Sequence, residues 1–408
     1  MIALLAALSL VLVGCDPGKP PPPAAPGPGR LAAVSAPAVL EPARGVAAPV
    51  GDGVAGLLDH PALGPRVGAV VVDAVTGSVI LERAADRPRT PASLLKLLTA
   101  AAALTTTDLA AGLRTAVVES PGGITLVGSG DTTLDRRDLR VLAGETATAL
   151  RAAGRTTVDL VVDDSLFAGP AVSPDWRPTY VPSVVDPVTA VPAETVRRLV
   201  RLLERREITV TGLREGKAPA GAVELAAVES EPMAVLVERM LRTSDNDLAE
   251  SLLRHVALAA GRSATFADGT AATASALAAL GLPTDGLVLL DGSGLARGSR
   301  VSPRLLANLL ALAADPRADP SLDHLLSGLP VGGFTGTLAT RYRQRGGGHV
   351  RAKTGTLTGV SNLAGVASDA TTAVVFVLMA DRVPADTLAA RAALDRFAAR
   401  LAGTAGAG

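Results

Sequence analysis

Strand-like runs at both ends of this 408-residue sequence, with helix-like segments between them, restrict the folds that the chain can adopt. Near the beginning, Val67 to Val72 and Val79 to Glu82 flank a turn at residues 74–78, which predicts a β-hairpin. Near the end, three more strands are predicted, at Val350 to Lys353, Leu363 to Ser368 and Thr372 to Leu378. We therefore expect one mixed sheet, completed by segments that are distant in the sequence and flanked by helices.

Helical segments occupy much of the remaining chain. Leu94 to Leu104 is rich in Leu and Ala and apolar nearly all round, which is typical of a buried helix. Pro91 and Ala92 precede it, so Ser93 is expected near a helix N-terminus. Helical periodicity returns in four later segments, Met233 to Ala260, Thr270 to Leu280, Pro303 to Ala314 and Ala385 to Leu401. The fold class predicted from these elements is α/β, in the broad sense that includes α+β.

The stretch from about Thr106 to Val228 has a different sequence pattern from the segments on either side. It contains short β-like runs such as Val158 to Val162, and turns rich in Pro and Asp around Pro170 to Pro192. We interpret residues 106–228 as an inserted subdomain.

The first 49 residues also differ from the rest. Ile2 to Val13 is an apolar run too short to span a bilayer stably, and Gly14 and Cys15 follow it. It resembles a bacterial lipoprotein signal, whose cysteine becomes the lipidated first residue, although no Lys or Arg precedes the run. The alternative is an ordinary signal peptide with a stray cysteine.

Residues 16–49 are rich in Pro, Ala and Gly, which predicts a semi-extended spacer. With residues 1–15 as signal and Cys15 as lipidation site, the sequence predicts an exported protein of the cell envelope. A lipid anchor would hold it on the outer face of the cytoplasmic membrane.

Charge and metal-ligand content exclude several function classes. Lys and Arg total 39 and Asp and Glu total 39, so no excess positive charge is available for nucleic acid. The single cysteine allows no internal disulfide, and the four histidines have no metal-ligand spacing. We therefore expect no metal and no cofactor. Only four residues are lysines, at positions 19, 96, 217 and 353, so each is a candidate for a role that needs an ammonium able to lose its proton.

Three short motifs carry the candidate chemistry. Ser93 and Lys96 are three residues apart, which on a helix places a hydroxyl and an amine on one face. The amine can take the hydroxyl proton if burial or a neighbouring positive charge, for which Lys353 is a candidate, lowers its pKa. Alone, this spacing is more often a helix cap with a solvated lysine.

The second motif, Ser244-Asp245-Asn246, places a hydroxyl and a carboxamide on either side of one residue in a turn before a helix. The third, at Lys353 to Thr356, combines an ammonium, hydroxyls and a glycine on a predicted strand. A strand edge beside a cation suits an extended peptide that ends in a carboxylate. Each motif is weak alone, but one match to each in a single chain is rarely accidental.

This triple occurs in class A β-lactamases and penicillin-binding proteins, and the chain resembles that superfamily. Longer stretches make it similar to D-alanyl-D-alanine carboxypeptidase/endopeptidases of the class C, low-molecular-weight type: Pro91 to Leu98, Ser244 to Glu250, Asp291 to Leu295 with Val301 to Pro303, and Arg351 to Thr358. The resemblance covers about residues 50–401. The gap between Ser93 and Ser244, 244 − 93 = 151 residues, looks shorter than in relatives with two inserted domains, so we expect one reduced insertion.

The resemblance implies a penicillin-binding/β-lactamase-like transpeptidase fold. In that fold a mixed, mainly antiparallel sheet flanked by helices is combined with a helical subdomain and a smaller inserted domain. Residues 50–105 and 229–403 would then form the catalytic domain. The substrate would be peptidoglycan stem peptides ending in D-Ala-D-Ala, and β-lactam antibiotics would inhibit covalently.

The resemblance also implies roles for matching residues. Ser93 is acylated by the peptide, Lys96 is the base, and Ser244 relays a proton to the leaving amine. Asn246 holds Lys96 and the substrate amide.

On the third motif, the resemblance implies that Lys353 and Thr354 bind the terminal carboxylate. The backbone N–H groups of Ser93 and Thr356 form the oxyanion hole, and Gly355 lets the substrate backbone approach.

Two alternatives stay open. A β-lactamase shares the nucleophile but must deacylate quickly, in class A with a Glu and a nearby Asn, and no asparagine lies between Ser93 and Asn246. A non-catalytic peptidoglycan-binding protein of the same fold is the other alternative, and the intact Ser93 and Lys96 argue against it. Asp131 and Asp291 lie in glycine-rich segments that we interpret as turns, where they brace the site rather than take part in catalysis.

Overall fold

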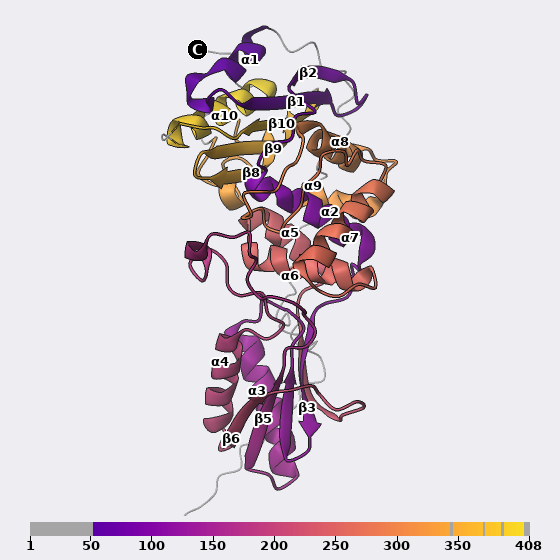
Figure 1. Cartoon of the computed structure of the whole chain (residues 1–408), viewed down its shortest axis with the longest axis vertical. Coiled ribbons are helices and arrows are strands. Elements are labelled where there is room, and N and C mark those ends of the chain that lie inside the picture. Colours follow the sequence, from indigo (N-terminus) through magenta and orange to yellow (C-terminus); the bar gives the residue numbers. More distant parts are fainter. Residues whose placement is uncertain (1–51, 343–345, 370–371, 385–386, 404–408) are drawn as a thin grey trace, which may run out of the picture. The chain divides into compact units, whose positions relative to one another are not determined.

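The two ends of the described chain meet in one five-stranded sheet of order β2-β1-β10-β9-β8 (Figure 1). The computed structural model describes residues 52–342, 346–369, 372–384 and 387–403. All four strand pairings in this main sheet are antiparallel. Its strands are β1 (Val67–Asp73), β2 (Val79–Arg83), β8 (Val350–Leu357), β9 (Val360–Ser368) and β10 (Ala373–Ala380). The predicted hairpin and the sheet made from distant segments are confirmed.

The central strand of the main sheet, β10, is apolar throughout because both of its faces are covered. In β10, Phe376 and Leu378 pack into one hydrophobic cluster, whereas Val375 and Val377 pack into another on the opposite face. The alternation follows from the two-residue period of a strand. A strand covered on both faces carries a near-continuous apolar run rather than an alternating one.

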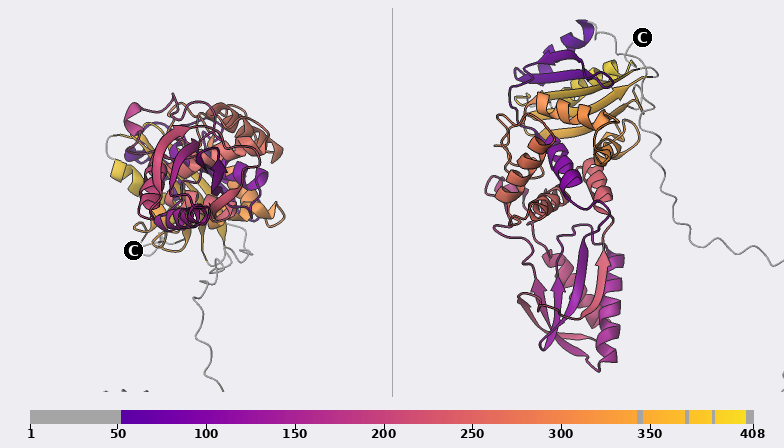
Figure 2. Two further views of the ribbon diagram at one scale, coloured as in Figure 1. Left: turned by 90° about the horizontal axis from the view of Figure 1, so that it is seen from below. Right: turned by 90° about the vertical axis from the view of Figure 1, so that its right-hand side faces the viewer.

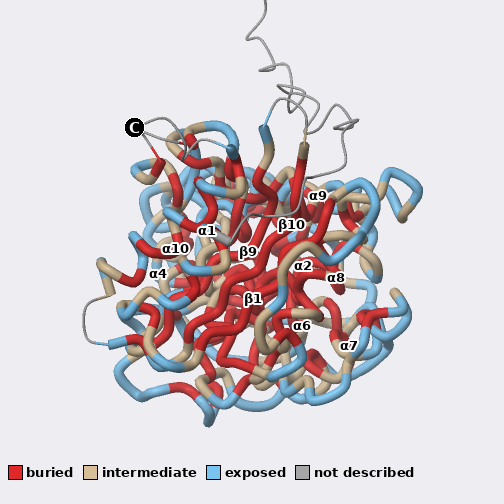
Figure 3. Tube along the Cα trace, turned by 90° about the horizontal axis from the view of Figure 1, so that it is seen from above, coloured by how far each residue is buried: buried red, intermediate tan, exposed pale blue. Residues whose placement is uncertain are grey.

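Helices cover both faces, as the burial of the chain trace illustrates (Figure 3). On one face lie α1 (Asp52–Gly56) and α10 (Thr387–Leu401), together with the short 3-10 helices at Leu57–Asp59 and Pro61–Leu63. The other face packs against a larger group of helices: α2 (Leu95–Thr106), α5 (Met233–Thr243), α6 (Asn246–Ala259), α7 (Phe266–Ala279), α8 (Pro303–Ala314) and α9 (Asp323–Ser327). The predicted fold class, an α+β sheet flanked by helices with a helical group beside it, is confirmed.

The predicted helices are confirmed, with one interruption. The helix expected at Leu94 to Leu104 is α2, and it is buried along most of its length. The segment from Met233 to Ala260 is two helices, because Ser244 adopts a left-handed conformation (φ 61°, ψ 36°) that ends α5. The side chain of Asp245 then accepts from the backbone N–H of Leu248 and caps α6.

A second five-stranded sheet, of order β6-β5-β4-β3-β7, is formed by residues between α2 and α5. Its elements are β3 (Arg114–Ser120), β4 (Gly123–Val127), α3 (Arg136–Ala152), β5 (Thr157–Asp163), α4 (Ala193–Glu204), β6 (Thr209–Glu215) and β7 (Glu224–Glu229). The main sheet is antiparallel and not mixed as expected, whereas this second sheet contains two parallel pairs, β4–β5 and β5–β6.

The second sheet has its own hydrophobic cluster. Apolar side chains of the sheet pack against α3 and α4, which lie along it (Figure 2). Leu142 and Leu199, one from each helix, are fully buried there. An inserted domain needs a hydrophobic core of its own, and this cluster provides one. The boundaries of the insertion, residues 106–228, stay a prediction.

The N-terminal expectations lie outside the described residues. These are the signal at residues 1–15, Cys15, and the spacer at residues 16–49. None of the helices that the structure does describe is both long and apolar enough to cross a bilayer.

One loop packs tightly against the segment that carries Ser93. Gly294 has a φ of +84°, and a Cβ added there would lie 1.9 Å from the carbonyl oxygen of Ala92. Ala92 itself has a positive φ of 48°. Only a residue without a side chain can occupy position 294, because both the backbone conformation and the space exclude a Cβ.

We predict that Gly294→Ala destabilises the fold by about 1–3 kcal/mol more than Gly281→Ala. Gly281 also has a positive φ, +74°, but no atom lies within 4 Å of the added Cβ. The pair therefore separates the steric clash from the backbone strain, and urea unfolding of both variants measures it. Equal losses of stability would mean that the loop simply moves away.

Candidate active site

Ser93 lies at the entrance to α2. It is the middle residue of the 3-10 helix η3 (Ala92–Leu94), which runs directly into α2. One turn later, Lys96 is fully buried, and its Nζ donates to Ser93 Oγ at 3.2 Å. Ser93 remains partly exposed. The helix spacing predicted from the sequence therefore brings the hydroxyl and the amine into hydrogen-bond contact.

The Nζ of Lys96 has two further acceptors from distant parts of the chain. Asn246 Oδ1 accepts at 2.8 Å and the carbonyl oxygen of Ser293 accepts at 2.8 Å. With Ser93, these partners account for the three donors of an ammonium. If Lys96 is neutral, two of the contacts can still be donated, and its lone pair is free to accept the Ser93 proton.

The pKa of Lys96 is lowered to about 8, because burial removes water from its ammonium. The negative charges of Glu250 and Asp291 oppose this shift. Of the two causes expected from the sequence, burial and a neighbouring positive charge, burial is the larger one. Near neutral pH a useful fraction of Lys96 is therefore unprotonated, as a general base requires.

The second motif lies between α5 and α6. Because Ser244 is left-handed and Asp245 extended, Ser244 and Asn246 both reach the site while Asp245 caps the helix. Ser244 Oγ accepts from Lys353 Nζ at 2.7 Å. The Nδ2 of Asn246 donates to the carbonyl oxygen of Val184 at 2.9 Å, so the amide that holds Lys96 is itself held from the other side.

Lys353, on β8, is as buried as Lys96. Its pKa is lowered well below the usual value, first by burial and then by the positive charge of Lys96. Its Nζ also donates to the carbonyl oxygen of Thr354 at 3.0 Å. The buried ammonium group of Lys353 therefore links Ser244 to strand β8 through hydrogen bonds.

Strand β8 is an edge of the main sheet, and its first half is covered. The backbone N–H of Ala352 donates outward to the carbonyl oxygen of Pro330 at 3.0 Å. In a strand the N–H groups of alternate residues point the same way, so those of Thr354 and Thr356 also point away from β9. The side chain of Thr354 donates to Thr337 Oγ1 at 3.1 Å, and Thr356 is exposed. An edge of this kind can accept an extended peptide as an added strand.

Gly355 has a packing reason that the sequence did not suggest. A Cβ at this position would lie 2.8 Å from the carbonyl oxygen of Pro91. The glycine therefore lets β8 approach the segment that carries Ser93, and its expected role toward the substrate backbone stays a prediction.

Two buried carboxylates support Lys96, and sequence reasoning missed one of them, Glu250. Both oxygens of Glu250 accept from backbone N–H groups, those of Gly292 and Ser293. Burial raises the pKa of Glu250, whereas its hydrogen bonds from Gly292 and Ser293 lower it. Glu250 and the second carboxylate, Asp291, both lie in stretches that carry the family resemblance. A carboxylate in a helix or a glycine-rich turn has no local sequence pattern that marks it as buried.

Asp291 holds the other side of the same loop. Its carboxylate accepts from the backbone N–H groups of Gly294 and Ala296, and from Trp176 Nε1 at 2.9 Å. Burial raises its pKa, and these donors oppose that shift. Asp291 thus fixes the loop whose Ser293 carbonyl holds Lys96. The expectation that it braces the site fits this geometry.

Two further supporting residues were not predicted. The Nδ2 of Asn362 donates to the carbonyl oxygens of Thr90 and Pro91, and its Oδ1 accepts from Ala380 N, so β9 and β10 hold the segment before Ser93. In the sequence, only the scarcity of asparagine pointed to Asn362. Nothing pointed to Thr337. In the described part of the chain, no three His, Cys, Asp or Glu side chains are grouped so as to hold a metal ion.

The candidate residues thus converge, except for Cys15, which lies outside the described chain. The sequence model of the D-Ala-D-Ala carboxypeptidase 3 (S13) family matches residues 52–191 and 188–401. The chain belongs to the S13 family. In this S13 protein, the match includes Ser93, Ser244 and Lys353 together with the second sheet.

Known relatives agree with the family match. This S13 chain is 34% identical to a carboxypeptidase of Mycobacterium tuberculosis, with 79% of this chain and 78% of the relative covered. It is also 34% identical to carboxypeptidase DacB of Mycolicibacterium smegmatis, over 86% and 82%. The structure of penicillin-binding protein 4 from Haemophilus influenzae has the same fold, with a TM-score of 0.74 and 23% identity over 86% of this chain and 98% of that one.

The buried charges predict a pH dependence. Because Lys96 can accept a proton only when neutral, kcat/KM for a D-Ala-D-Ala peptide should rise with pH, reach half its maximum near pH 8 and level off above that pH. Glu250→Gln keeps the shape of the side chain but removes the charge that most raises the pKa of Lys96, so the rising limb should move to lower pH. The measurement is kcat/KM across roughly pH 5–10, a range that extends below and above the pKa of Lys96.

Asp247→Asn is the control for this pH profile. Asp247 is on the same helix and raises the pKa of Lys96 less than Glu250 does, so its shift should be smaller. A limb that stays in place or moves upward in Glu250→Gln would contradict the assignment of Lys96 as the titrating base.

Proposed function

We propose that this protein is a serine-type D-Ala-D-Ala carboxypeptidase that cleaves peptidoglycan stem peptides through an acyl-enzyme on Ser93. The observation that carries the proposal is the contact of Lys96 Nζ with Ser93 Oγ, at 3.2 Å, with the pKa of Lys96 near 8. A serine hydroxyl is a poor nucleophile unless a base is beside it. Here the base is in contact with it and can be neutral at physiological pH.

In the acylation step, Ser93 Oγ attacks the carbonyl carbon of the penultimate D-alanine and its proton passes to Lys96. The carbonyl oxygen becomes an oxyanion, which accepts from the backbone N–H groups of Ser93 and Thr356. The N–H of Thr356 points outward from the edge of the sheet, where such a donor is needed.

The tetrahedral intermediate then collapses, and the bond between the carbonyl carbon and the terminal D-alanine nitrogen breaks. Ser244 relays a proton to the leaving amine. Its hydrogen bond from Lys353 keeps the hydroxyl oriented. Water next attacks the ester carbon, Ser93 recovers its proton, and the shortened stem peptide leaves as a carboxylate.

Substrate recognition uses β8 and the Ser244–Asn246 turn. The peptide lies along the open edge of β8, and the hydroxyl of Thr354 with the charge of Lys353 binds the terminal carboxylate. Asn246 holds the substrate amide as well as Lys96. Because the Asn246 amide already donates to Val184, the substrate contact uses its second N–H.

The test uses two soluble substrates, a stem pentapeptide ending in D-Ala-D-Ala and a cross-linked muropeptide dimer. We expect the full protein to release D-alanine from the pentapeptide, and Ser93→Ala to lose at least about 10³-fold in rate. Mass analysis of both reactions also reads out endopeptidase cleavage, since either bond presents a D-Ala carbonyl to the same serine. If Ser93→Ala keeps wild-type activity, the mechanism is wrong.

The same preparations, labelled with a fluorescent penicillin, separate the rival functions. Penicillin-binding protein 4 of Haemophilus influenzae has been solved with a β-lactam bound. We expect a stable acyl-enzyme on Ser93 of this protein. Turnover of the label within seconds would favour a β-lactamase, and failure of the wild type to label would favour a non-catalytic peptidoglycan-binding protein.

We also propose that the protein acts in the cell envelope and is anchored there through Cys15. Membership of a cell-wall peptidase family supports envelope action. The apolar run before Cys15 and the Pro-rich spacer after it support a lipoprotein signal followed by a tether. No nucleic acid partner is expected.

Expression of the full chain with a labelled fatty acid tests the anchor. The wild type should incorporate the label and stay with the membrane fraction, whereas Cys15→Ser should do neither. Because Cys15 is the only cysteine, no second thiol can take the label. Equal labelling of both proteins would refute the anchor but leave the catalytic proposal untouched.

A further inference from the structure

Arginine side chains gather along a groove between α3 and α4. The groove encloses about 410 Å³. Its charged lining is five arginines and a single carboxylate: Arg136, Arg140, Arg198, Arg201, Arg205 and Glu194. The whole chain has equal numbers of positive and negative residues, so this groove departs sharply from the average.

The arginines follow the helix period. Arg136 and Arg140 are one turn apart on α3, while Arg198, Arg201 and Arg205 recur on one face along the end of α4. A turn of α-helix advances about 5.4 Å. The groove therefore presents two facing rows of charge rather than one point.

Three of these side chains have no internal ion pair to satisfy them. Glu194 accepts from Arg198 at 2.7 Å and lies 3.4 Å from Arg201, so its one negative charge is shared. Within the described residues, the guanidinium groups of Arg136, Arg140 and Arg205 have neither a hydrogen bond nor an ion pair. Arg136, Arg140 and Arg205 are all exposed.

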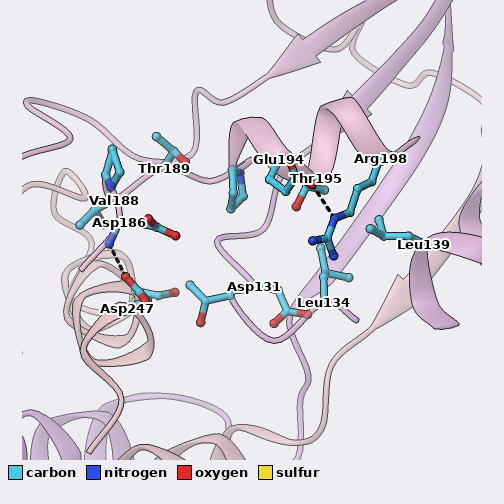
Figure 4. A pocket seen from close by; sticks show the side chains of 14 residues that line it. Asp131, Leu134, Leu139, Asp186, Val188, Thr189, Glu194, Thr195, Arg198 and Asp247 are labelled. Atoms are coloured by element: carbon cyan, nitrogen blue, oxygen red, sulfur yellow. Dashed lines mark hydrogen bonds and ion pairs between the residues drawn. The ribbon is translucent and has the colours of Figure 1, made fainter. Parts of the chain in front are cut away.

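The opposite sign of charge limits the groove at one end. A neighbouring cavity shares Leu139, Glu194 and Arg198 with the groove and carries the carboxylates of Asp131, Asp186 and Asp247 (Figure 4). In that view Arg198 turns back to Glu194, and the aspartates face the cavity beyond. A bound anion would be attracted along α3 and α4 and repelled from the side of α6.

We propose that the arginine groove binds a linear phosphodiester polyanion, such as a glycerol-phosphate polymer of the cell envelope. Guanidinium groups pair with phosphate oxygens in a bidentate way, and paired rows of them suit a repeating anion better than a single ion. A concave groove admits a polymer strand but not a flat bilayer. The two leucines that line it, Leu139 and Leu202, are not exposed, so no apolar group is offered to a membrane.

This binding site goes beyond the proposed peptidase function and does not depend on Ser93. It would hold the enzyme on an anionic wall polymer while the peptidase site acts elsewhere on the molecule. Because the attraction is between exposed charges, it should weaken as ionic strength rises and the Debye length shortens.

The experiment measures binding of synthetic poly(glycerol phosphate) to the full-length protein by calorimetry at low and physiological ionic strength. We expect Arg136→Gln/Arg205→Gln to bind roughly tenfold or more weakly. The control is Arg137→Gln/Arg214→Gln, which removes the same charge from exposed positions outside the groove. Both variants should keep the wild-type rate on a soluble pentapeptide, which shows that they are folded.

Other probes make the outcome decisive. Absence of binding by the wild type at low ionic strength, or an equal loss in both double variants, overturns the proposal. So does equal binding of polyglutamate, which would make the groove a non-specific anion site. If vesicles containing phosphatidylglycerol bind with the same arginine dependence and the polymer does not, the ligand is a membrane surface instead.

Discussion

The site depends on one nitrogen atom, the Nζ of Lys96. Burying an ammonium is costly unless its protons find acceptors, and here the three acceptors come from three separate parts of the chain. Ser93 comes from the start of α2, Asn246 from the start of α6, and the Ser293 carbonyl from a loop between α7 and α8. The position of each of these elements is therefore tied to the same atom. The fold places a base beside the serine hydroxyl, and to do so it must bury the ammonium group of Lys96 completely.

Two carboxylates beneath the site keep that charge tolerable without touching it. Glu250 and Asp291 bond to backbone N–H groups of one loop, and their negative charges favour the ammonium form of Lys96. Burial pulls the pKa of Lys96 downward while the carboxylates pull it upward. The balance leaves it near 8, within reach of a general base, instead of far lower, where the lysine would lose its attraction for its partners.

The sequence was sufficient to predict the parts of the site that lie within local motifs. Ser93 and Lys96 share a helical turn, and the residues around Ser244 and Lys353 are adjacent in sequence, so their types and spacings are visible without a fold. The supporting contacts are long-range. Trp176 and Asp291 are 115 residues apart, and Asn362 lies more than 270 residues from the carbonyls that it holds. No periodicity encodes such pairs, because tertiary packing alone creates them. The packing constraint on Gly355 is also long-range, because it comes from the carbonyl oxygen of Pro91, on a distant segment of the chain.

The order of strands in the main sheet has a consequence for biosynthesis. Strand β1 pairs with β10, and about 300 residues separate the two along the chain. While the chain is being made, β1 and β2 can form only an isolated hairpin, which is marginally stable in water. The catalytic edge strand β8 has no neighbour until β9 follows it, and the sheet closes only when β10 is complete. A nascent chain thus contains its nucleophile early but its working centre last, so a truncated product would carry the serine without the chemistry.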